Sequence, residues 1–198
     1  IDAYGELDAG QESHVLNIGL DDESGGYLMT KYLLECGYEH IQVCAGRDNG
    51  VDHLRYMGAQ RAAREFAGKK QKVQFTALGM NYAKRKESYA WLIQRKKPKT
   101  ALFFLSDLYA LEAISFFSSR GVKIPEEIGI AGYDNISYAE FSVPRLTTVS
   151  QNVEQKASLA VEILMERING EDKERENEIR LPVTLISRKS VQRQDEKK

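Results

Sequence analysis

Residues 101–105 read ALFFL, and this run of five apolar residues decides the fold. A short continuous apolar run is typical of a strand buried on both faces, as in a parallel sheet covered by helices. Residues 107–120 then follow helical spacing and stop at Gly121, so the strand leads directly into a helix. Pro125 next turns the chain into a second apolar stretch at 128–133. The pattern therefore predicts a β–α–β unit with parallel strands.

The same alternation continues towards the N-terminus. We expect strands at 14–20, 41–45 and 73–78, separated by helices at 25–36, 51–67 and 84–95. Ser24 is the predicted N-cap of the first of these helices, and Gly37 is its predicted stop. Repeated alternation of strands and helices indicates an α/β protein with a mostly parallel sheet.

Beyond residue 145 the pattern changes to a short strand, a long helix and a final strand region. The strands are expected at 146–149 and 179–188, with a charge-rich connector at 171–178 and a polar tail at 192–198. The helix at 153–168 is amphipathic. Its apolar face is predicted to be Val153, Ala157, Ala160, Val161, Leu164 and Ile168.

Composition places the chain among soluble globular proteins. Its 198 residues are 42% hydrophobic and 29% charged, which suits one domain or two small lobes. The net charge of −1 argues against a chain that itself grips nucleic acid, because phosphate binding needs an excess of Lys and Arg. No apolar run approaches the roughly 20 residues of a membrane span. The chain opens on Ile1 without a signal-peptide pattern, so we expect a part of a longer cytoplasmic protein.

No catalytic or metal-binding motif is present in the sequence. The nucleophile elbow GxSxG, the HExxH pair, the P-loop and GxGxxG are all missing. The histidines stand alone, without ligand spacing to one another or to a cysteine, and the two cysteines, Cys36 and Cys44, fit small buried side chains. We therefore expect no enzyme activity, no metal and no cofactor.

Several segments, in this order and spacing, resemble the effector-binding region of lactose-repressor-family transcription regulators. They are LDDESGG at 20–26, LLECGYEHI at 33–41, LRYMGAQ at 54–60, KTALFFLSDLYALEA at 99–113, IPEEIGIAGYDN at 124–135, VPRLTTVSQ at 143–151 and LPVTLISRKS at 181–190. The resemblance covers nearly the whole chain.

The resemblance implies two Rossmann-like lobes of the type I periplasmic-binding-protein kind, with a ligand cleft between them. Crossovers between the lobes are expected near Gly37, Ser150 and Arg180. Residues 1–36 and 150–180 would form a partial N-terminal lobe, and residues 37–149 and 181–198 the C-terminal lobe. The DNA-binding helix-turn-helix and the first strands of the N-terminal lobe are expected to lie outside this chain.

Polar side chains follow the ends of the predicted strands, where ligands bind in open parallel sheets. Arg55 comes after the strand at 41–45 and its loop, Ser106 and Asp107 end ALFFL, and Asp134 ends the strand at 128–133. Carboxylates, amides and a guanidinium are the groups that pair with sugar hydroxyls. These positions therefore favour a sugar-like ligand.

The resemblance extends this set by position. Arg55 and Asp134 match effector-contacting residues of the family, whereas Ser106 stands where many members carry Asn. The further matching positions are Ser24, Met80 or Tyr82 as the stacking residue, and Gln151.

Each of these residues also has a purely structural interpretation. Arg55 could lie on a helix surface, Asp107 could serve as an N-cap, and the Asp134 side chain could only hold its turn. Tyr82 could be a surface or core residue.

The function these features predict is a ligand-responsive transcription regulator, in which a small polar effector binds between the lobes. The alternative is a periplasmic or lipid-anchored sugar-binding protein of a transporter, which shares the fold. No motif in the sequence supports an enzyme.

The helix at 107–120 also predicts self-association into a homodimer. Leu108, Leu111 and Ile114 suffice to pack it on the sheet, while Tyr109, Ala113, Phe116 and Phe117 form a second apolar set. The loop that follows GYDN adds two further aromatic residues, Tyr138 and Phe141. Such aromatic sets mark interfaces when they are exposed, and the resemblance places this region at a two-fold contact. The alternative is that the aromatic side chains pack on one another within one chain. The predicted interface residues are Leu111, Phe116, Phe117, Tyr138 and Phe141.

Overall fold

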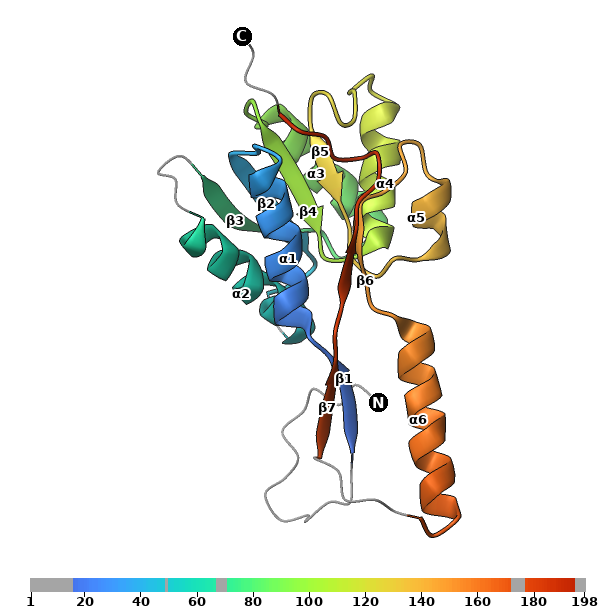
Figure 1. Ribbon diagram of the computed structural model, residues 1–198. Coiled ribbons are helices and arrows are strands. Elements are labelled where there is room, and N and C mark those ends of the chain that lie inside the picture. The colour runs from blue at the N-terminus through green and yellow to red at the C-terminus, as the bar shows by residue number, and fades with distance from the viewer. Residues whose placement is uncertain (1–15, 49, 67–70, 172–176, 195–198) are drawn as a thin grey trace.

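The computed structural model describes residues 16–48, 50–66, 71–171 and 177–194. It consists of a large upper body and a small lower body, joined at a narrow waist (Figure 1). The lower body holds three elements, β1 (Asn17–Leu20), α6 (Val153–Ile168) and β7 (Glu178–Leu181). All other elements belong to the upper body.

A four-stranded parallel sheet forms the centre of the upper body. Its order is β3 (Lys72–Ala77), β2 (His40–Ala45), β4 (Thr100–Phe104) and β5 (Gly129–Ala131). Every residue of β4 is buried, as its apolar run predicts. The α/β fold with parallel sheets is thus confirmed.

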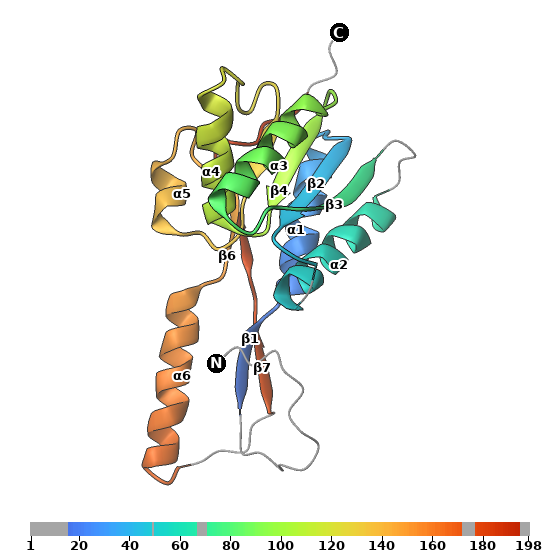
Figure 2. The same cartoon turned by 180° about the vertical axis from the view of Figure 1, so that it is seen from behind.

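Helices cover both faces of this sheet (Figures 1 and 2). On one face lie α1 (Asp22–Glu35) and α2 (Gly50–Glu65), and on the other α3 (Tyr82–Gln94) and α4 (Asp107–Ser118). Each face has its own apolar core. Ile41 and Val43 belong to the first core, and Cys44 and Phe104 belong to the second, because alternate residues of a strand point to opposite faces.

Two short strands line the edge of the sheet next to β5. The strand β6 (Thr148–Ser150) runs beside the end of β5 through single bridges, Ala131 to Thr147 and Asp134 to Ser150. It also pairs antiparallel with β8 (Thr184–Ile186). Between β5 and β6 lies the short helix α5 (Ser137–Phe141).

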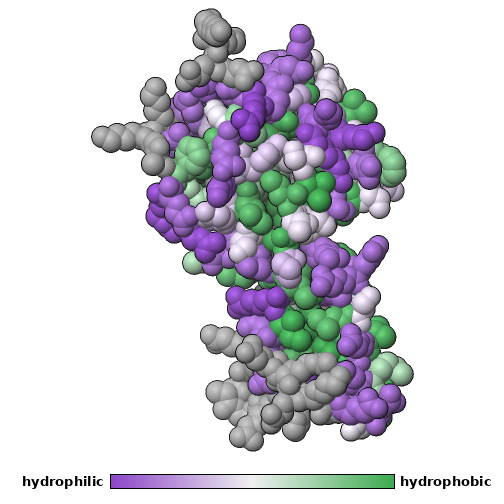
Figure 3. Space-filling model, viewed as in Figure 1, coloured by the Kyte–Doolittle hydropathy of each residue, from purple (hydrophilic) through white to green (hydrophobic). Residues whose placement is uncertain are grey.

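The lower body leaves much apolar surface uncovered. The strands β1 and β7 pair in parallel, and hydrophobic atoms gather on the surface around them and α6 (Figure 3). The buried residues of α6 are Lys156 and Ile163, whereas most of the predicted apolar face points to solvent. Its exposed members are Ala157, Val153 (63%), Val161 (60%), Leu164 (57%) and Ile168 (66%). The predicted face is thus apolar but largely uncovered in this chain, because periodicity shows that a face is apolar but not that a partner covers it.

The chain passes between the two bodies at Asp21, at residues 150–152 and after Leu181. The first passage lies earlier than the predicted crossover near Gly37. Helix α1 packs along α2 in the upper body, so residues 22–36 do not belong with the lower body as predicted. Most of the predicted connector at 171–178, the start of the predicted strand at 14–20 and the end of the tail lie outside the described residues.

The predicted N-cap residues of two helices were wrong. Asp21, not Ser24, is the N-cap of α1, since its side chain accepts the Ser24 amide hydrogen at 3.0 Å. Ser106 holds the N-cap position of α4, which was predicted for Asp107.

No helix among the described residues is long and apolar enough to span a membrane. Among the same residues, no group of three or more His, Cys, Asp and Glu side chains lies close enough together to hold a metal ion.

Candidate ligand-binding site

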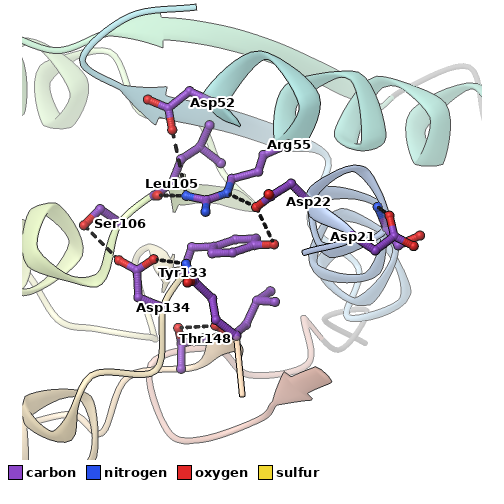
Figure 4. A network of polar contacts seen from close by, with 12 residues as sticks. Asp21, Asp22, Asp52, Arg55, Leu105, Ser106, Tyr133, Asp134 and Thr148 are labelled. Atoms are coloured by element: carbon purple, nitrogen blue, oxygen red, sulfur yellow. Dashed lines mark hydrogen bonds and ion pairs between the residues drawn. The ribbon is translucent and has the colours of Figure 1, made fainter. Parts of the chain in front are cut away.

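Arg55 occupies the centre of a polar cluster at the carboxyl ends of the parallel strands (Figure 4). Its Nε donates to Asp22 Oδ1 at 2.8 Å, and its Nη1 donates to the backbone oxygen of Leu105, at the end of β4, also at 2.8 Å. The guanidinium carbon lies 3.7 Å from the centre of the Tyr133 ring. With only 8% of its surface exposed, Arg55 is not the surface arginine that was one of its two interpretations.

Tyr133 and Asp22 complete the buried part of this cluster. The Tyr133 hydroxyl donates to Asp22 Oδ1 at 3.3 Å, and both side chains are buried. Burial raises the pKa of Tyr133, so the phenol stays protonated and can donate. Burial acts to lower the pKa of Arg55, but the neighbouring Tyr133 and Asp22 outweigh it and leave that pKa raised. The Arg55 guanidinium is consequently charged, and its bond to Asp22 holds it in place.

Asp134 lies beside this buried pair and is only partly covered. Its Oδ2 accepts from the Ser106 hydroxyl at 3.2 Å, and its Oδ1 accepts from the Gln151 side-chain amide at 2.6 Å. Its backbone has a φ of 115°, a conformation that residues other than glycine rarely adopt and that often marks functional sites. The structure thus brings Arg55, Asp134, Ser106 and Gln151 together, as a shared ligand site requires.

The carboxylates here are held in an environment that disfavours their charge. Burial raises the pKa of Asp134, against the lowering effect of the Arg55 charge. Burial likewise raises the pKa of Asp52, whose Oδ1 lies 3.9 Å from Arg55 Nη1. Hydroxyl donors from a ligand would stabilise these acceptors in the charged form. The site therefore suits a neutral ligand with several hydroxyl groups.

Asp107 is a structural residue in this structure. It is completely buried, and its carboxylate accepts from the Thr148 hydroxyl at 2.6 Å and from the Ile136 amide at 2.9 Å. Burial raises the pKa of Asp107 to about 7. These contacts tie the start of α4 to β6 and to the turn before α5, so the side chain has no face left for a ligand.

The remaining predicted contacts lie at the margin of the site. Met80, between β3 and α3, is 64% exposed, and Tyr82, the first residue of α3, is 49% exposed. The Lys86 Nζ lies 5.0 Å from the centre of the Tyr82 ring. Met80 lies near Gly46, just after β2, and so at the same edge of the sheet as Arg55. Ser24 is half-buried in the first turn of α1.

Sequence reasoning missed Asp22, Asp52 and Tyr133 as members of the site. Asp22 lies in LDDESGG and Tyr133 in GYDN, two segments that carried the family resemblance. Their signal was an acidic pair and an aromatic residue directly at strand ends. Only the approach of α1 to α2 shows that Asp22 is the partner of Arg55.

Two residues of the predicted dimer surface lie in the interior of the chain, whereas the other three are at least partly exposed. Phe116 and Phe117 of α4 are 6% and 0% exposed, and their rings pack against Tyr89 of α3. This is the packing within one chain that the alternative interpretation described. Tyr138 and Phe141 are 73% and 77% exposed. Together with α4 they form an apolar groove of about 530 Å³, which we call the α4–α5 groove; its lining includes Leu108, Leu111, Ile114, Tyr138, Phe141 and Val143.

The sequence of this chain is similar to a known protein family and to curated repressors. Residues 30–191 match the family described as periplasmic binding protein-like domain. The HTH-type transcriptional repressor PurR of Haemophilus influenzae is 36% identical over 180 residues, which are 87% of this chain and 53% of that protein. The repressor of the same name from Aliivibrio salmonicida is 35% identical over 188 residues, 93% of this chain and 56% of that protein. The chain thus spans about half the length of these curated relatives.

Solved structures show the same fold. A LacI-family transcriptional regulator from Enterococcus faecium with bound ribose superposes with a TM-score of 0.81 and 27% identity, over 93% of this chain and 68% of that one. A periplasmic binding protein/LacI transcriptional regulator from Alkaliphilus metalliredigens, complexed with D-xylulofuranose, gives a TM-score of 0.75 and 28% identity, over 89% of this chain and 65% of that one. A dimeric Lac repressor, at 21% identity and a TM-score of 0.75 over 89% of this chain and 64% of that one, shares the fold.

Proposed function

This chain belongs to the periplasmic-binding-protein-like domain family, and from that membership we propose that it is the effector-binding part of a lactose-repressor-type transcription regulator. The observation that carries the proposal is the cluster of Arg55, Asp22, Tyr133 and Asp134 at the carboxyl ends of the sheet. We propose a small polyhydroxylated effector, such as a sugar, as its ligand. Ribose and D-xylulofuranose in two similar structures support this class.

Binding would act by changing how the two bodies lie relative to each other. The site faces the waist, and Gln151, which bonds Asp134, lies on the passage into α6. A ligand held from both sides would favour the closed arrangement, by no more than its difference in affinity for the two arrangements. In the whole protein, contact with operator DNA would come from a helix-turn-helix outside this chain, and the protein would be cytoplasmic.

The transporter alternative has weaker support. The curated relatives described above are repressors, and the proposed function needs no catalytic group. The lower body would be part of the second lobe, whose remaining elements cover the exposed apolar side chains of α6. Two observations support this proposal: the lower body has only one two-stranded sheet among the described residues, and the chain spans about half the length of its curated relatives.

Replacing Asp134 with Asn should weaken effector binding by about tenfold to a hundredfold, the effect of losing one charge-assisted hydrogen bond. A thermal-shift screen against sugars and nucleobases identifies the effector, because a ligand that binds only the folded protein raises its melting temperature. Titration calorimetry of the variant then measures the loss. Asp48→Asn is the matched control, since Asp48 is exposed and its ion-pair partner among the described residues is His53, which is also exposed. If wild type and Asp134→Asn bind the effector with equal affinity, Asp134 does not contact the effector.

We further propose that the α4–α5 groove is the contact between two copies of the chain. The groove is continuous and apolar, and Val143 on its rim is 85% exposed. A two-fold dimer would suit a regulator that reads paired DNA half-sites.

The double variant Tyr138→Glu, Phe141→Glu should convert the dimer to a monomer, because buried carboxylates without partners oppose association. Light scattering over a concentration series measures the mass in solution. The control is Leu28→Glu, Met57→Glu, which places the same charges on exposed apolar residues of α1 and α2. A dimer that persists in the groove variant, or a monomeric wild type, would contradict this interface.

A further inference from the structure

The face of β2 and β3 that points towards α3 is polar, although β2 is an internal strand. Neighbouring residues of the two strands pair as His40 with Lys72 and Gln42 with Gln74. Only Cys44, opposite Thr76, belongs to the apolar core on this side. Internal strands of a parallel sheet covered on both faces are normally apolar on both. The opposite face of the same strands, with Ile41 and Val43, follows that rule. The polar face therefore has a cause other than core packing.

A furrow runs between this polar face and α3. Its basic end lies at the amino ends of the strands and encloses a cavity of about 110 Å³, and a wider part of about 420 Å³ lies further along β3. Trp91 of α3 lines both parts and is 45% exposed. On the floor, the Thr76 hydroxyl donates to Gln42 Oε1 at 2.8 Å.

Cationic side chains gather at the enclosed end of this furrow. Two nearby lysines are neutralised, Lys96 by Glu127 at 3.2 Å and Lys99 by Glu39 at 2.8 Å. In contrast, Lys72 and Lys97 form no ion pair with any residue that the structure describes. Arg95 stacks on the Trp91 ring, with its guanidinium carbon 4.9 Å from the ring centre. A concave site with uncompensated cations attracts anions.

We propose that this furrow is a second ligand site, which binds a nucleoside phosphate. The phosphate would lie at the enclosed end between His40, Lys72 and Lys97, which is too small for a folded protein segment. The base would stack along Trp91, with the amides of Gln42 and Gln74 as hydrogen-bonding partners for its edge. The site lies at the amino edge of the sheet, opposite the Arg55 cluster, and does not depend on the proposed function.

His40 should respond directly to an anion. Burial lowers the pKa of His40, the nearby Lys97 and Lys72 lower it further, and only Glu39 acts to raise it. A bound phosphate would oppose these lysines and raise that pKa, which the ring-proton resonances in an NMR titration report.

Trp91 is the only tryptophan of the chain, so its fluorescence reports on this site alone. We expect at least one of AMP, GMP, CMP and UMP to quench it saturably, with the matching nucleoside and inorganic phosphate each binding at least about tenfold more weakly. The variant Lys72→Gln, Lys97→Gln should lose about tenfold or more in nucleotide affinity. The charge-matched control Lys31→Gln, Lys86→Gln and the cluster variant Asp134→Asn should both bind as wild type.

Three results would overturn this assignment. The first is the absence of quenching by all four nucleotides. The second is an equal loss in the control double variant, which would mean general charge attraction. The third is a preference for inorganic phosphate or for polyglutamate, which would mean a plain anion site or a docking surface for an acidic protein.

Discussion

Replacing Arg55 with Ala should lower the free energy of unfolding by about 3–5 kcal/mol, the usual effect of breaking a buried ion pair on one side. Asp22 would remain buried, with the Tyr133 hydroxyl as its neighbour but without the guanidinium that compensates its charge. The variant would also lose the stacking of the guanidinium on the Tyr133 ring and its hydrogen bond to the backbone oxygen of Leu105. Urea denaturation of both proteins measures the difference.

The same helix supplies a matched control for this substitution. Arg61, also on α2, pairs with Glu23 of α1 at 2.9 Å, but both side chains are exposed, at 40% and 37%. Arg61→Ala should therefore change stability by no more than about 1 kcal/mol. Adding Asp22→Asn to Arg55→Ala should recover part of the loss, because it removes the buried carboxylate that the guanidinium pairs with. Equal effects of Arg55→Ala and Arg61→Ala would contradict the buried pair.

Replacing Gly26 with Ala should destabilise the protein by roughly 3 kcal/mol or more, at the upper end of overpacking effects. A β-carbon at this position would lie 1.8 Å from the backbone oxygen of Arg55. Gly58 meets the backbone oxygen of Glu23 at the same distance, so each helix presses a glycine against the backbone of the other. Backbone atoms cannot rotate away, and α1 and α2 would have to separate.

The sign of this effect is diagnostic, because Gly→Ala inside a helix normally stabilises by about 1 kcal/mol. Gly19→Ala is the control, since a β-carbon there meets nothing within 4 Å. Thermal unfolding measures both variants. Separation of the helices would also draw Asp22 away from Arg55, so effector binding should fall together with stability in Gly26→Ala. A stabilised Gly26→Ala variant would rule out the close helix contact.

The sequence by itself determined the order of the upper body and the position of much of its site. Strand burial follows from local composition, so ALFFL was sufficient to predict β4 and the parallel sheet around it. In such a sheet, residues that follow different strands meet at the carboxyl edge, whatever their separation in the chain. That rule was sufficient to predict, from the sequence alone, that Arg55 and Asp134 lie in one cluster.

Only the tertiary structure decided which faces and partners these elements use. Helix α4 is apolar on most sides, so its periodicity could not show that Phe116 and Phe117 turn inward while Leu108 turns outward. Periodicity identified the apolar face of α6 but could not show whether it is covered, because that depends on a partner rather than on the helix. Asp22 joins Arg55 only because two glycines let α1 approach α2. Local pattern reports the chemistry of each segment, whereas pairing across 33 positions depends on how closely two backbones can pack.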